Sequence, residues 1–233
     1  MRGVEADDPG RIKTPEELIR YIDTVGFLPL FKNEIPGFSV EEHTLAENWW
    51  SDDAEAEDPW RWREVLAGSG KVAYGKFFHN KAGFISLEWL PYFVNFRRQG
   101  YDFDSLWEEG KARYRSKRIM DLLLDGETLF SYEIKQKAGF GKDGEKNFDG
   151  TLTELQMQTY LVVREFCSRV NQQGQPYGWH IARYAMPESI WGYDAVTAAY
   201  REKPEVSYQR IVQRIREVYP QAQESQIKKV LKR

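Results

Sequence analysis

Apolar residues recur at helical spacing in three segments of the first half of the chain, and clear start signals precede two of these segments. Thr14 is a good N-cap residue, and Pro15 follows it at a position where a missing N–H costs nothing. Asp58 and Pro59 repeat this arrangement. The pattern therefore predicts helices over residues 15–25, 60–66 and 90–98.

Two runs of alternating residues lie between the second and third of these helices. They cover residues 71–78 and 81–86, and His79–Asn80 joins them, so we predict a pair of strands. The third helix must start near Leu90, because Pro91 is tolerated only in a first turn.

The second half is predicted to be mainly helical and to contain one hairpin. Its elements are short helices over residues 119–125 and 131–138, a glycine- and lysine-rich loop over 139–150, a longer helix from Thr151 to about Ser168, and a hairpin over 169–173 and 177–184. Three helices followed by a hairpin is the order of a winged helix, whose third helix usually enters the major groove of DNA. Two further helices end the chain, with Pro220 between them.

The charge distribution divides the 233 residues into two unlike parts. Residues 1–110 carry 12 Lys and Arg against 21 Asp and Glu, a net of −9, whereas residues 111–233 carry 21 against 15, a net of +6. We therefore place a domain boundary near Gly110. A basic second half is compatible with a polyanionic partner, although the whole chain has a net charge of only −3.

Several classes of protein are disfavoured by the composition. No apolar run approaches the roughly 20 residues of a membrane-spanning helix, and the polar N-terminal segment does not have the pattern of a secretory signal. The single Cys167 cannot form an internal disulfide, so a cytoplasmic protein is expected. The three histidines are far apart and no cysteine pair exists, so we expect neither a metal site nor a cofactor.

Candidate nucleic-acid-binding residues gather in the predicted winged helix. Lys and Arg side chains supply phosphate contacts, whereas Gln side chains hydrogen-bond base edges or the backbone. The cations are Arg113, Arg115, Lys117, Arg118, Lys135, Lys137 and Lys142, and the amides are Gln156, Gln158, Gln172 and Gln173.

Candidate catalytic residues are fewer and lie in the aromatic-rich first half. Glu34 and His43 fall in a segment where an apolar pocket could raise the pKa of a general acid. Ordinary surface residues have the same sequence appearance, so these two stay hypotheses at this stage.

Four blocks of the sequence resemble the AlkZ-related family of bacterial proteins. They are Gly26–Phe31, Asp58–Arg63, Tyr74–Phe78 with Gly83–Ser86, and Leu155–Leu161, and the likeness spans roughly residues 14–195. A remote link joins this family to the winged-helix DNA glycosylases AlkZ and YcaQ, which excise alkylated bases and unhook crosslinks without a metal or cofactor. The resemblance implies an α+β, mostly helical chain with tandem winged helices.

Combined with the charge boundary, this resemblance predicts four parts of the chain. They are a flexible tail over residues 1–13, an aromatic-rich acidic winged-helix-like domain over 14–110, a basic winged-helix domain over 111–195, and a helical extension over 196–233.

The glycosylases' catalytic motif is missing at its expected place. They use a glutamine, an apolar residue and a second glutamine or aspartate near the start of the chain, where this sequence has Leu28–Pro29–Leu30. Gln156–Met157–Gln158 has the right letters, but we predict it inside a helix. Side chains two residues apart on a helix point about 200° apart, so the two amides could not converge on one target.

Three functions remain open from the sequence. The first is a DNA-binding winged-helix protein associated with base repair, with or without glycosylase activity. The second is a non-catalytic module that binds a protein partner or a second copy of the chain. The third is a small-molecule enzyme whose pocket is lined by the aromatic residues. None of the three requires a membrane.

Overall fold

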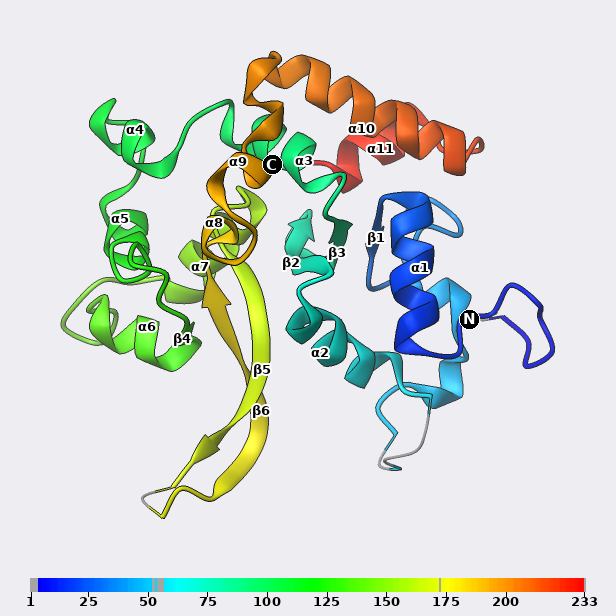
Figure 1. Ribbon diagram of the computed structural model, residues 1–233, viewed down its shortest axis with the longest axis horizontal. Coiled ribbons are helices and arrows are strands. Elements are labelled where there is room, and N and C mark those ends of the chain that lie inside the picture. Colours follow the sequence, from blue (N-terminus) through cyan, green and yellow to red (C-terminus); the bar gives the residue numbers. More distant parts are fainter. Residues whose placement is uncertain (1–3, 52, 54–56, 172, 233) are drawn as a thin grey trace.

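The computed structural model describes residues 4–51, 53, 57–171 and 173–232 (Figure 1). The chain is α+β, as expected, and its strands form a six-stranded antiparallel sheet in the order β1-β3-β2-β5-β6-β4. The strands are β1 Phe27–Pro29, β2 Val72–Phe78, β3 Lys81–Ser86, β4 Leu129–Phe130, β5 Val162–Val170 and β6 Pro176–Ala185. The α-helices are α1 Pro15–Val25, α2 Pro59–Ser69, α3 Leu90–Arg98, α4 Phe103–Glu108, α5 Tyr114–Met120, α6 Ser131–Lys137, α7 Phe148–Met157, α8 Pro187–Trp191, α9 Tyr193–Val196, α10 Pro204–Val218 and α11 Glu224–Val230, with 3-10 turns η1 Val40–His43, η2 Ala46–Asn48 and η3 Ala198–Arg201.

Local signals in the first half place three of its helices and one strand pair as predicted, whereas β1 and α4 were not predicted. The Thr14 hydroxyl accepts a hydrogen bond from Glu17 N at the start of α1, and Asp58 caps α2 through Trp60 N. β2 and β3 turn at His79 and Asn80, which both have positive φ, as a tight hairpin requires. The helix predicted to start near Leu90 does start there.

The prediction of one helix from Thr151 to about Ser168 is wrong. α7 starts earlier, at Phe148, and ends at Met157, after which Thr159 takes a positive φ that a helix cannot contain. Val162 then begins β5. Apolar residues at 162, 163 and 166 fit either a helix or a strand locally, and pairing with β6 selects the strand.

Two smaller corrections concern the same half. The helix predicted over residues 119–125 lies earlier, as α5, and the chain turns after Met120. The predicted hairpin exists but is longer at its base, because β5 begins at Val162 and β6 ends at Ala185, and β5 ends at Val170 rather than at residue 173. The two C-terminal helices form as predicted, on either side of Pro220.

A similar order of elements occurs twice along the chain. In the first half α1, β1, α2 and the β2–β3 pair follow one another, and in the second half α5, β4, α6, α7 and the β5–β6 pair do so. Within each set the first strand pairs with the last, and the middle strand faces the other set. The two sets meet at one register position, Tyr74 opposite Val163. α2 packs on β5 and α7 packs on β2, so each set covers part of the other.

The apolar core is divided into two clusters. One contains the first half, the start of β5, Val196 of α9, and the helices α10 and α11, of which α10 packs along α3 (Figure 1). The other is built from residues 103–161. Whether the two halves are separate domains with a boundary near Gly110 stays a prediction.

Two consecutive buried arginines at the end of α3 join these parts. Arg97 donates to Phe77 O at 2.9 Å and to Leu231 O at 2.9 Å, so it ties β2 to the C-terminal end of α11. Arg98 pairs with Glu188 of α8 and donates to Thr159 O at 2.8 Å. The side chain of Arg98 is only 1% exposed, so its charge depends on Glu188 for compensation.

We predict that Glu188→Gln destabilises the fold by about 3–5 kcal/mol, because the amide leaves the Arg98 charge buried without a counter-charge. Urea unfolding measures this as a lower midpoint. The control is Glu224→Gln, which breaks the exposed pair with Lys228 and leaves the midpoint unchanged. Equal midpoints for the two variants would show that Arg98 does not need Glu188.

Candidate functional site

The predicted cations are only partly available for a ligand. Arg113 pairs with Glu154 at 2.9 Å, and Lys117 pairs with Asp121. Arg115 is half-buried, and Arg118 packs its guanidinium against Gly139, where a Cβ would lie 2.7 Å from a guanidinium nitrogen.

Three lysines at and after α6 remain open to solvent. Lys135, Lys137 and Lys142 are exposed, and none of them forms an ion pair with a carboxylate of the described residues. The first two lie on α6, and the third lies in the loop that follows it.

The predicted glutamines are separated by the fold. Gln156 is buried in α7, where its Oε1 accepts from Lys76 N at 3.2 Å and its Nε2 donates to Leu152 O, so it fastens α7 to β2. Gln158 lies at the C-cap of α7 and lines a cleft that does not include Gln156. Gln173 is exposed at the hairpin turn, and Gln172 lies outside the described residues.

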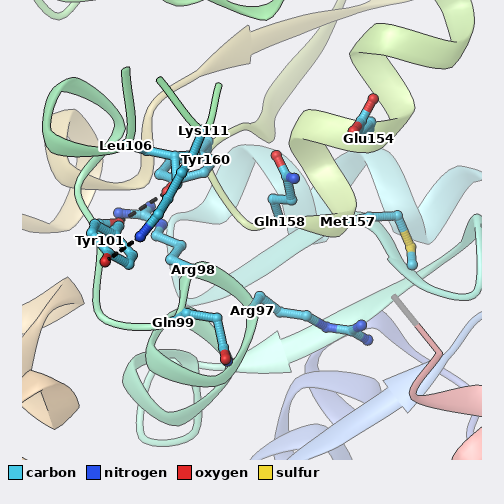
Figure 2. A pocket seen from close by; sticks show the side chains of 10 residues that line it. All are labelled: Arg97, Arg98, Gln99, Tyr101, Leu106, Lys111, Glu154, Met157, Gln158 and Tyr160. Atoms are coloured by element: carbon cyan, nitrogen blue, oxygen red, sulfur yellow. Dashed lines mark hydrogen bonds between the residues drawn. The ribbon is translucent and has the colours of Figure 1, made fainter. Parts of the chain in front are cut away.

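Figure 2 shows the cleft that Gln158 lines, a space of about 590 Å³ between the end of α3, the α4–α5 connection and the end of α7. Its cations are already engaged by the protein. Arg97 and Arg98 make the contacts described above, and Lys111 Nζ lies 2.6 Å from both the Tyr101 hydroxyl and Glu109. The cleft therefore offers little positive charge to an anion.

The β5–β6 hairpin projects from the body of the molecule (Figure 1). Its pairing places Cys167 opposite Ile181 and Arg169 opposite Tyr177, so Gly178, Trp179 and His180 bulge opposite a single residue of β5. Gly178 has a φ of 73°, and His180 Nδ1 lies 2.6 Å from Glu64 on α2. The bulge leaves the Trp179 side chain 92% exposed.

The hairpin is tied to α6 on another side. The Arg169 guanidinium lies over the Tyr132 ring at 4.6 Å, and α6 packs against β6. We call the exposed side chains of α6, the following loop and the hairpin the α6–hairpin surface; they are Tyr132, Lys135, Lys137, Lys142, Arg169, Tyr177 and Trp179. The sequence reasoning missed Trp179, although a glycine beside a tryptophan within a strand is a bulge signal.

A second, apolar groove of about 520 Å³ lies where the two sets of strands meet. Trp60, Tyr74, Phe166 and Tyr184 contribute rings to its lining. Burial raises the pKa of Tyr74 to about 12, and burial, helped by the Asp149 charge, raises the pKa of Tyr184 to about 12. The groove therefore holds neutral phenols at physiological pH.

The two catalytic candidates lie in different surroundings. Glu34 pairs with Lys229 of α11 and lines a small cleft of about 210 Å³ beside His79 and Lys81. The hydrogen bond from Lys229 lowers the pKa of Glu34, so the carboxyl is ionised rather than a general acid.

His43 lies in a hydrogen-bonded setting of its own. Its Nε2 lies 2.8 Å from Gly37 O and 2.9 Å from the Tyr21 hydroxyl, so the ring braces the loop between β1 and η1. The described residues contain no group of three or more His, Cys, Asp or Glu side chains that could hold a metal ion.

Comparison with known proteins gives one result. A family model described as "AlkZ related" matches residues 12–232. No curated protein and no solved structure matches the chain. Within the described residues, the helices are too short or too polar to cross a bilayer.

We predict that the stability contributed by Tyr184 is complete below pH 10, the ordinary tyrosine pKa of the unfolded chain, and is lost as the pH rises toward about 12. Folding holds the phenol neutral, so ionisation at high pH favours the unfolded state. Tyr184→Phe keeps the ring and removes the proton. Urea midpoints measured between about pH 9 and pH 11.5 should fall less steeply for this variant than for the parent. Parallel profiles would contradict a buried, neutral phenol in the groove.

Proposed function

Because the chain belongs to the AlkZ-related family, we propose that it is a DNA-binding protein that acts on damaged bases. The family match covers nearly the whole chain, and the family is remotely linked to winged-helix DNA glycosylases. The α6–hairpin surface supports the proposal, because it combines unpaired lysines with an exposed tryptophan.

We propose further that the twice-repeated order of elements is a pair of winged helices. A winged helix consists of a helix, a short strand, further helices and a hairpin, and its first strand pairs with the last strand of the hairpin. Both sets follow this order and pairing. The β5–β6 hairpin is then the second wing.

The third helix of the second set, α7, is poorly suited to contact bases in the major groove. Leu152, Leu155 and Gln156 of α7 are buried, and its solvent side carries Asp149 and Glu154. Asp149 would repel phosphates, and Glu154 is already paired with Arg113, so this side of α7 offers little attraction to DNA. We therefore assign DNA contact to α6, the following loop and the hairpin.

Each part of this surface has a distinct role in the proposal. Lys135, Lys137 and Lys142 neutralise phosphates, which makes affinity depend on salt. Trp179 stacks on a base or wedges between base pairs, because a ring that is almost wholly exposed can reach the nucleic acid without displacing protein contacts. The bulge and the contact between His180 and Glu64 hold the backbone beside Trp179 in place.

We predict that the variant Lys135→Ala, Lys137→Ala, Lys142→Ala lowers the slope of log K against log salt by about 0.7–0.9 for each phosphate that the variant no longer neutralises. Trp179→Ala weakens binding about tenfold at every salt concentration, since stacking is not ionic. Fluorescence anisotropy with a labelled duplex and a single strand measures both effects.

The matched control removes three exposed cations elsewhere, with Lys203→Ala, Arg216→Ala and Lys232→Ala. It changes the net charge equally and should leave the slope unchanged. If both triple variants bind like the parent, or if the parent binds no DNA at low salt, the proposal fails. The non-catalytic protein-interaction module then becomes the better interpretation of the exposed tryptophan.

For base excision, we propose Glu34 as the group that positions water and stabilises positive charge on the sugar. An alkylated purine already carries positive charge and leaves without protonation, so an ionised carboxylate suits this step. His43 would act as a positioning residue for the loop that carries Glu34.

We predict that Glu34→Gln abolishes base release from alkylated duplex DNA without weakening duplex binding, because only the charge is removed. Gel assays of base release, after heat cleavage of abasic sites, measure the activity. Glu224→Gln, which removes another carboxylate paired with a lysine, is the control and retains activity. Normal release by Glu34→Gln removes Glu34 from the mechanism.

A further inference from the structure

The groove between the two sets of strands has aromatic walls, and the charged residues that line it are all positive. Phe31, Trp60, Phe166 and Tyr184 are half-buried, so parts of their rings face open space. Gly75 lies in the lining, and this position adds no side chain to fill the groove. A volume of about 520 Å³ lies within the roughly 300–1,000 Å³ of ordinary ligand pockets.

Arg63 supplies a buried donor to this groove. Its guanidinium lies 3.8 Å from the centroid of Trp60 and 4.2 Å from that of Phe166, and its side chain is only 8% exposed. Glu64 lies 3.2 Å from one terminal nitrogen, but the Arg63 Nε–H has no hydrogen-bond acceptor among the described residues. Arg63 therefore adds a buried positive charge to the wall of the groove, packed between two of its rings.

Two lysines add positive charge to the same lining. Lys76 and Lys81 are exposed, and no aspartate or glutamate of the described chain lines the groove with them. Lys76 Nζ makes one contact, 3.3 Å from Thr153 Oγ1, which leaves donors free. The groove thus combines flat apolar surface, the buried charge of Arg63 and two exposed cations.

From this combination we propose that the groove binds one nucleotide unit. The base lies against the exposed parts of the Trp60 and Phe166 rings, beside the Arg63 guanidinium, and the phosphate contacts Lys76 and Lys81. Stacking of a base on protein rings contributes about 1–3 kcal/mol, and phosphate contacts add a salt-dependent part. The unit is supplied either as a free nucleoside monophosphate or as a nucleotide unstacked from a DNA strand.

The site does not require the α6–hairpin surface, so it goes beyond the proposed function. Only the binding of a nucleotide that is unstacked from a DNA strand rests on the proposed function. The free nucleotide tests the groove alone.

The first experiment is calorimetric titration of the full chain with dTMP and, separately, with ribose 5-phosphate, which has the phosphate but no base. We expect dTMP to bind and ribose 5-phosphate to bind at least about tenfold more weakly, since it cannot stack. Lys76→Ala should weaken dTMP binding by about fivefold or more. Lys203→Ala, which removes an exposed lysine elsewhere, should leave it unchanged.

The second experiment locates the base by photocrosslinking. 5-Iodo-dUMP and a single-stranded oligonucleotide with one 5-iododeoxyuridine are irradiated with the protein, and the linked peptides are identified by mass spectrometry. We expect links to Trp60, Phe166 or Tyr184. The Phe166→Leu variant should give a lower crosslinking yield. Its thermal unfolding temperature is measured as well, to verify that the variant is folded.

The outcomes separate the two proposals. Binding of dTMP with groove crosslinks, but no DNA binding, supports the groove and overturns the proposed function. DNA binding with crosslinks only at Trp179 and no dTMP binding overturns the groove and leaves the proposed function standing. Equal affinity of the parent and Lys76→Ala for dTMP also overturns the groove.

Discussion

The arrangement of the chain depends on satisfying two adjacent cations inside the protein. Arg97 and Arg98 follow one another at the end of α3, so their side chains leave the helix in different directions. Each must find acceptors, because an uncompensated buried charge is very costly. One finds carbonyls of β2 and α11, and the other finds Glu188 and the carbonyl of Thr159. One helix end therefore fixes the position of four other segments.

Sequence reasoning succeeded where the determining signal is local. The caps at Thr14 and Asp58 and the turn at His79–Asn80 each involve only a few neighbouring residues, and all three were predicted correctly. It failed at residues 158–168, where the state is decided by partners far away. Val163 pairs with Tyr74 and Tyr184, and neither partner can be identified from the spacing of apolar residues alone.

The candidate site shows the same division between local and distant information. The closeness of Arg113 and Lys117 in the sequence indicated a basic patch. However, the Glu154 carboxylate, which is distant in sequence, neutralises Arg113. Gln156 looked available for recognition and is instead buried against β2. The exposure of Trp179 depends on a mismatch in strand register, of which the sequence offers only one hint, the glycine at position 178. The sequence therefore predicted which types of side chain are present, but not which of them are free to contact a ligand.

The meeting of the two strand sets at a single register position has a mechanical consequence. Elsewhere in the sheet two or more register positions join neighbouring strands, but β2 and β5 share one, and the packing of α2 on β5 and of α7 on β2 also holds this seam together. Side chains on both sides of the seam also line the groove. A ligand bound in the groove contacts both sets of strands. By thermodynamic linkage, such a ligand stabilises the closed seam by the same free energy by which the closed seam strengthens ligand binding.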